Sequence, residues 1–172
     1  MNDPALALAR LKEVALPTNA AHLPLLLDDI NAKVLTAEAY IQQDRLSDAV
    51  SIAGAALESL RASPLRDDYQ VLEADASLWL GEAQLRTGAV QLARTNLERA
   101  LRLRESNDNE KSPQIAQAEI SLARCLIELG DLARAKILHK KARDIEATHK
   151  ELGAQFTNPL NELGSRLAHY RG

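Results

Sequence analysis

With 172 residues, of which 46% are apolar and 26% charged, the chain is long enough to bury the core of one domain or one short solenoid. Its net charge of −3 and its dispersed basic residues argue against a nucleic-acid partner, and no run of about 18 apolar residues is present to span a membrane. A single cysteine excludes an internal disulfide, and the first residues lack a signal-peptide pattern, so we expect a cytoplasmic protein unless the chain belongs to a longer one.

Proline, glycine and short polar segments divide the chain into predicted helices. Gly88 and Gly130 can adopt positive φ at low cost, so each is a natural end for a helix, and Asp44 stands at a comparable turn. The pattern predicts an all-α single domain with an N-terminal helix at 4–15, helical hairpins at 21–62, 68–105 and 113–152, and a terminal helix at 159–170.

Small residues recur at fixed positions within the three hairpins. In each hairpin a first-helix position and a second-helix alanine are 20 residues apart, at 36 and 56, 80 and 100, and 122 and 142. Alanines at 49, 93 and 135 give repeat periods of 44 and 42 residues. Small side chains allow two helix backbones to approach closely, and a constant hairpin with variable connections indicates stacked helical repeats.

These three units resemble tetratricopeptide repeats over about 25–145. The resemblance rests on the Leu80-Gly81 pair, on its weaker equivalents at 36–37 and 122–123, on the turn residues and on the paired alanines. The period points to the long-period subclass, as in kinesin light chains and many bacterial regulatory proteins. The resemblance implies a right-handed α-solenoid that binds a protein or peptide on the concave surface formed by the first helices.

The terminal helix allows two interpretations. Leu160, Leu163 and Leu167 give it one apolar face, so it is predicted to cover the exposed end of the stack. Alternatively, Leu163-Gly164 begins a fourth repeat, of which the sequence contains only the first helix.

Equivalent first-helix positions give the candidate partner-binding residues. They form two aliphatic rows, one charged row and one polar row: Val34, Leu78 and Ile120; Ile41, Leu85 and Ile127; Glu38, Glu82 and Arg124; and Gln42, Arg86 and Glu128. The alternative for the aliphatic rows is a place in the core, and the alternative for the charged row is solvated surface.

Trp79, the only tryptophan, is a further candidate. A partly exposed tryptophan on a binding surface is a typical anchor for a partner. The alternative is that its ring fills space between neighbouring repeats.

No residue pattern predicts catalysis, a metal site or a cofactor. The four histidines lack metal-ligand spacing, no glycine-rich phosphate loop is present, and Cys125 replaces a small residue of the other repeats. We therefore expect a non-catalytic interaction module that binds a protein or peptide. The alternatives are a regulatory or sensor domain of a larger bacterial kinase or transcription regulator, and a protein like the secretion chaperones. An uncovered apolar face also allows a homodimer.

Overall fold

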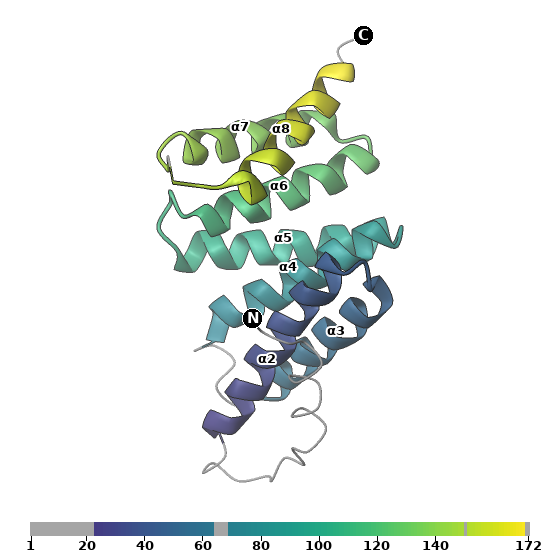
Figure 1. The fold of residues 1–172 in the computed structure, drawn as a ribbon, viewed down its shortest axis with the longest axis vertical. Coiled ribbons are helices and arrows are strands. Elements are labelled where there is room, and N and C mark those ends of the chain that lie inside the picture. The colour runs from purple at the N-terminus through teal and green to yellow at the C-terminus, as the bar shows by residue number, and fades with distance from the viewer. Residues whose placement is uncertain (1–22, 64–68, 150, 171–172) are drawn as a thin grey trace.

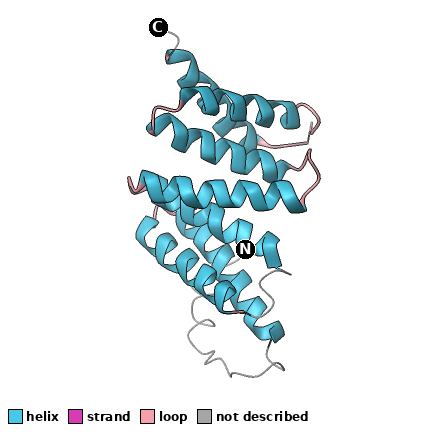
Figure 2. Cartoon of the chain, turned by 180° about the vertical axis from the view of Figure 1, so that it is seen from behind, coloured by secondary structure: helices cyan, strands magenta, loops and turns pink. Residues whose placement is uncertain are grey.

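The computed structural model describes residues 23–63, 69–149 and 151–170, and within these ranges it contains helices and no strand (Figures 1 and 2). The predicted helix at 4–15 lies outside the described residues. The helices are α2 (Leu23–Gln42), α3 (Leu46–Ala62), α4 (Gln70–Arg86), α5 (Val90–Asn107), α6 (Pro113–Glu128), α7 (Leu132–Glu146) and α8 (Ala154–His169).

The helices form hairpins that stack along the long axis of the molecule (Figure 1). α2 pairs with α3, α4 with α5, and α6 with α7. The first helix of the second and of the third hairpin also packs on both helices of the hairpin before it: α4 contacts α2 and α3, and α6 contacts α4 and α5. The all-α helical-repeat architecture predicted from the sequence is confirmed.

The turns inside the three hairpins have the same backbone conformation. Asp44, Gly88 and Gly130 have φ angles of 61°, 83° and 77°. At each turn the next residue donates its N–H to a carbonyl five residues back, as Ala89 does to Gln84 at 2.8 Å. This bond closes the helix C-terminus in the manner of a Schellman motif. The predicted turn residues are therefore the ones that the hairpins use.

Gly81 lies where α4 and α5 approach each other closely. A Cβ atom on Gly81 would stand 2.6 Å from Leu97 Cγ and 3.2 Å from the Ala93 carbonyl oxygen. Leu97 and Ala93 are fully buried on α5, so neither can move aside at low cost. The hairpin therefore depends on the missing side chain at this position.

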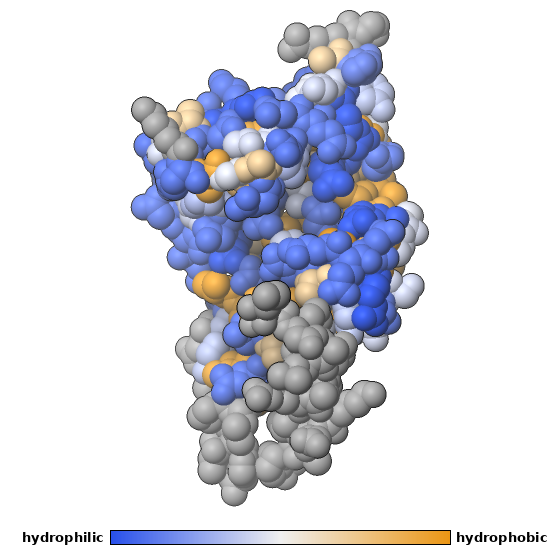
Figure 3. Space-filling view, in the orientation of Figure 1, coloured by the Kyte–Doolittle hydropathy of each residue, from blue (hydrophilic) through white to orange (hydrophobic). Residues whose placement is uncertain are grey.

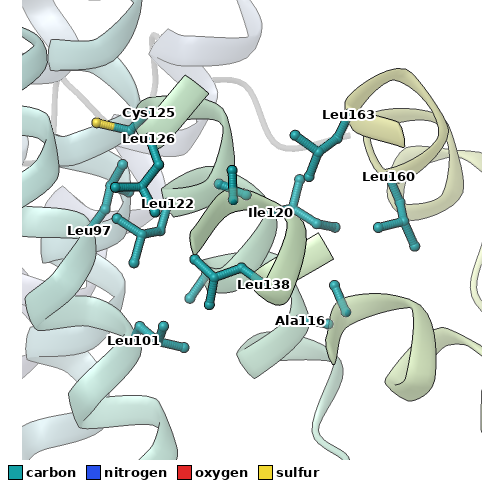
Figure 4. Close-up of a cluster of buried hydrophobic side chains, with 14 of the residues drawn as sticks. Leu97, Leu101, Ala116, Ile120, Leu122, Cys125, Leu126, Leu138, Leu160 and Leu163 are labelled. Atoms are coloured by element: carbon teal, nitrogen blue, oxygen red, sulfur yellow. The ribbon is translucent and has the colours of Figure 1, made fainter. Parts of the chain in front are cut away.

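The buried side chains form one large cluster across α4–α8 and a second across α2–α4. Figure 4 shows part of the large cluster, in which leucines of α5, α6, α7 and α8 meet. Leu160 and Leu163 of α8 are almost completely buried in it. α8 is therefore part of the same core as the hairpins.

α8 begins earlier than predicted, and the expected start at 159 is corrected to 154. Gly153 adopts an extended conformation, and its carbonyl accepts the N–H groups of Phe156 and Thr157. Pro159 therefore lies inside the helix, where it removes one backbone hydrogen bond. Phe156 packs against the large cluster, which offsets that loss.

α7 ends at Glu146 rather than near 152. Its last buried residue is Ile145, so continuing the helix would bury nothing more on that face. The Ile145 carbonyl accepts both the hydroxyl and the backbone N–H of Thr148, at 2.8 and 3.0 Å, and the His149 N–H, its partner in a continued helix, donates to the Glu146 carbonyl instead. The connection from 147 to 153 leaves α8 free to fold back over the hairpin.

α8 occupies the position of a further first helix, since it contacts α6 and α7 as α6 contacts α4 and α5. Its outward side is polar. Matching Leu163-Gly164 of α8 to Leu122-Ala123 of α6 gives an offset of 41 residues. With this offset the buried Ile120 and Ile127 correspond to Asn161 and Ala168, and both of these are exposed. α8 thus lacks the aliphatic side chains with which the other first helices stack, which favours the capping interpretation.

α6 has the clearest N-cap. Ser112 precedes Pro113, and its hydroxyl accepts the Gln114 N–H at 3.2 Å. We expect Ser112→Ala to lower the free energy of unfolding by about 1 kcal/mol, because this donor loses its partner. Urea denaturation measures the change, and an unaltered midpoint would show that the cap contributes nothing.

Candidate functional site

The sides of α2, α4 and α6 that carry exposed or half-buried residues, together with the buried Glu82, form the candidate binding surface, which we call the first-helix face. Its residues follow each other at spacings of three and four, or seven between the first two on α6, so they lie on one side of each helix. The face comprises Asn31, Leu35, Glu38 and Gln42 of α2; Asp75, Trp79, Glu82 and Arg86 of α4; and Gln117, Arg124 and Glu128 of α6. In the view of Figure 3, hydrophilic residues predominate and apolar residues lie between them in separate groups.

One predicted aliphatic row does not belong to this face. Val34, Leu78 and Ile120 are only 3%, 3% and 5% exposed and lie in the two core clusters. The prediction that they contact a partner is therefore corrected, because their surface is already covered by neighbouring helices. The alternative place in the core is the one that the structure gives them.

The second aliphatic row is only partly available. Ile127 is buried in the large cluster, whereas Ile41 and Leu85 are half-buried and pack against core residues with part of their surface. Ile41 and Leu85 therefore keep an apolar edge toward solvent, and Ile127 does not.

The charged row connects neighbouring repeats. Arg124 of α6 donates to Glu82 of α4 over 3.4 Å, and Glu82 is buried. Glu38 of α2 is half-buried, and its pKa is raised by burial and by the nearby carboxylate of Asp75. The packing of α4 on α2 and of α6 on α4 places these exposed sides next to one another.

The polar row adds two further connections between repeats. Arg86 of α4 donates to the Ile41 carbonyl at 2.8 Å and to the Asp44 carboxylate at 2.6 Å, both at the C-terminal end of α2. Glu128 of α6 accepts a hydrogen bond of 2.6 Å from Arg166 of α8. Gln42 is exposed, and its amide lies 3.4 Å from the Glu38 carboxylate.

Trp79 is half-buried and packs against both core clusters. It therefore fills space between the first and second hairpins, as the alternative interpretation expected. The exposed part of its ring still lies on the first-helix face, between Asp75 and Glu82 of the same helix. Binding at this face would change its surroundings, so the ring is a built-in fluorescence reporter.

A surface pocket of about 260 Å³ lies at one end of the first-helix face. It is lined by Leu85, Arg86, Gly88, Val90, Arg124, Glu128 and Arg166. The lining comes from the end of α4, the α4–α5 turn, the first residue of α5, α6 and α8, and three of its residues carry a guanidinium group. Four lining residues were candidates from the sequence, and the structure brings them together: Leu85, Arg86, Arg124 and Glu128.

Leu35 and one whole row of this face were not predicted from the sequence. Asn31, Asp75 and Gln117 are exposed or half-buried, each seven residues before a member of the charged row. Asp75 accepts a hydrogen bond from the buried Arg104 of α5, and burial raises its pKa. The seven-residue spacing was the available signal, since such residues lie on the same side of a helix.

Cys125 is buried, and burial raises its thiol pKa to about 11, so it stays protonated at neutral pH. Within the part of the chain that the structure describes, no three histidine, cysteine, aspartate or glutamate side chains are grouped so as to hold a metal ion. None of the helices in the described ranges combines the length and apolar character needed to cross a membrane.

Residues 72–145 match the family model of the tetratricopeptide repeat. The matched segment runs from α4 to α7 and thus covers nearly all of the second and third hairpins. A search of curated proteins found no match. These two hairpins are therefore similar to a repeat family whose members generally bind other proteins and are typically non-catalytic.

Proposed function

We propose that this protein is a non-catalytic interaction module that binds a protein or peptide on the first-helix face. The observation that carries the proposal is the continuity of this face over three successive hairpins, with Glu38 close to Asp75 and Arg124 joined to Glu82. Stacked helical repeats present such extended surfaces to their partners. The similarity of residues 72–145 to the tetratricopeptide repeat supports the same conclusion.

The spacing of the turns supports a place in the long-period group of these repeats. Asp44 and Gly88 are 44 residues apart, Gly88 and Gly130 are 42 apart, and all three have positive φ. The common repeat of the family has a period of about 34 residues. The additional residues lengthen the helices and extend the first-helix face along each of them.

The face combines an exposed aliphatic side chain with charged ones. Leu35 is 56% exposed on α2 and adjoins Glu38, while Trp79 offers a partial aromatic surface on α4. Partners are commonly anchored by a few apolar or aromatic contacts surrounded by polar ones. Leu35 and Trp79 are therefore the apolar contacts in this proposal, and the charged residues set the orientation of the partner.

Two substitutions at equally exposed aliphatic residues test the proposal. Leu35→Glu places a charge on the first-helix face, and Ile137→Glu, at a residue 59% exposed on α7, places the same charge elsewhere. We expect Leu35→Glu to reduce capture of a specific protein from native lysate about tenfold, since an apolar contact would become an unpaired carboxylate. Ile137→Glu should capture as much as the parent protein.

Both variants should keep the parental melting temperature, because substitutions at such exposed positions change stability little. Equal capture by the parent and Leu35→Glu would exclude the first-helix face as the binding surface. Loss of capture by Ile137→Glu alone would indicate that the partner binds on the side of the second helices instead.

A further inference from the structure

Three arginines from three different helices meet at the surface pocket. Arg86 belongs to α4, Arg124 to α6 and Arg166 to α8, and each lines the same space of about 260 Å³. Glu128 is the only acidic residue of the lining, so the lining itself carries three positive charges and one negative charge. Leu85 and Val90 supply an apolar wall beside them.

The guanidinium groups retain unused donors. Each has five N–H groups in a planar fork. Arg86 uses its two terminal nitrogens for the Ile41 carbonyl and Asp44, and Arg166 uses one for Glu128. Arg124 makes a single long contact of 3.4 Å to Glu82. Arg124 is therefore the guanidinium whose hydrogen-bonding capacity is used least.

Two of the three present ion pairs can open at low cost. The side chains of Asp44 and Glu128 are 77% and 47% exposed, so both carboxylates can turn to solvent. Glu82 is only 10% exposed and stays beside Arg124. An entering anion would then meet three guanidinium groups, the fixed carboxylate of Glu82 and the Glu128 carboxylate of the lining, a net charge of +1.

The size of the pocket indicates what enters it. Sites for complete small-molecule ligands usually occupy about 300–1,000 Å³, so a pocket of about 260 Å³ better fits one side chain of a larger partner. Leu85 and Val90 can cover the methylene groups of a glutamate while its carboxylate faces the arginines.

We propose that this pocket receives an acidic side chain, best a glutamate, of the partner bound to the first-helix face, with Arg124 as its main contact. The inference rests on the proposed function and adds the orientation of the partner along the first-helix face. The acidic part of the partner lies at the α6 and α8 end, away from the carboxylates of Glu38 and Asp75.

An NMR titration tests the pocket with a defined probe. The probe is a blocked pentapeptide of alternating alanine and glutamate, and its twin carries glutamine in place of glutamate. The backbone amide of Gly88 and the Nε–H signals of the three arginines report binding, because all four residues line the pocket. We expect the glutamate peptide to bind about threefold or more tightly than the glutamine peptide, since a carboxylate gains charge-assisted hydrogen bonds.

Substitutions distinguish binding in the pocket from a general effect of the protein's positive charge. Arg124→Gln should abolish the preference for glutamate. Because this variant leaves Glu82 unpaired and can impair folding, Arg166→Gln is a second variant, which should reduce the preference. Arg102→Gln removes the same charge from an exposed residue of α5 outside the pocket and should keep the preference.

Equal binding of both peptides, no shift at Gly88, or equal losses in Arg102→Gln and Arg124→Gln would overturn the proposal. So would tighter binding of inorganic phosphate than of the glutamate peptide, which would make the pocket a general anion site. If the titration fails while Leu35→Glu still loses capture, the pocket proposal fails and the first-helix face remains.

Discussion

Gly81→Ala is expected to lower the free energy of unfolding by about 1–2 kcal/mol, although alanine favours a helix over glycine by about 1 kcal/mol. The new Cβ atom would lie 2.6 Å from Leu97 Cγ and 3.2 Å from the Ala93 carbonyl oxygen. Since both residues are fully buried, α4 and α5 must move apart, which weakens the core around them. Urea denaturation of the two proteins measures the difference.

Gly54→Ala is the matched control. Gly54 also lies inside a helix, α3, but a Cβ atom there meets nothing within 4 Å. This substitution should raise stability by about 1 kcal/mol, because only helix propensity changes. The two variants should therefore shift in opposite directions. If Gly81→Ala is stabilised as much as Gly54→Ala, the hairpin is not held by the close approach of α4 and α5.

Glu119→Gln is expected to stabilise the protein by about 3 kcal/mol at pH 8 and to leave it nearly unchanged at pH 4. Glu119 is 1% exposed, and its Oε2 atom has no hydrogen-bond partner among the described residues. Burial raises its pKa from 4.5 to about 7; Lys141, at 3.9 Å, opposes the shift, whereas Glu105 and Asp144 add to it.

The sign follows from the raised pKa. Below pH 4.5 the carboxyl group is neutral in both the folded and the unfolded chain. Between pH 4.5 and about 7 the unfolded chain loses the proton first, so the folded state is progressively destabilised. The parent protein should therefore lose stability over this range relative to Glu119→Gln.

Denaturation with urea at pH 4 and pH 8 provides the measurement. Glu105→Gln is the control, because Glu105 also faces Lys141, at 3.5 Å, but is an exposed residue. Its effect should be much smaller than that of Glu119→Gln at either pH, because exposed ion pairs contribute little and Glu105 is a minor cause of the Glu119 shift. A Glu119→Gln protein that is less stable than the parent at pH 8 would contradict the assignment.

The hairpins could be predicted because their signals are local. The residues with positive φ lie two positions after the end of the first helix of each hairpin, and the small residues of α4 and α5 are close in sequence. The start of α8 could not be predicted in this way. Its first turn is stabilised by the packing of Phe156 on the core, and that contact depends on the tertiary structure.

The binding surface was predicted only in part, because neighbouring stripes of a helix differ by one residue. A shift of one position turns a side chain by about 100°, so Val34 and Leu78 point into the core while Leu35 remains exposed and Trp79 half-buried. Without the packing partners, periodicity does not decide between two such apolar stripes. The charged residues of the face were easier to place.

The arginine pocket and the burial of Glu119 depend on contacts between distant parts of the chain. Arg86 and Arg166 line the same pocket although 80 residues separate them. The positions of the other repeats that correspond to Glu119 include Ser77, so the repeat pattern gave no sign of a buried carboxylate. Both features follow from how the hairpins stack rather than from any single hairpin.

Photo-crosslinking at single positions tests most directly whether a partner binds the first-helix face. A benzophenone side chain is introduced at Gln42, exposed on α2, or at Lys136, exposed on α7, and each protein is irradiated in native lysate. Binding on the first-helix face predicts a protein adduct from position 42 that is absent from position 136. An adduct from position 136 alone, or none from either position, would contradict it.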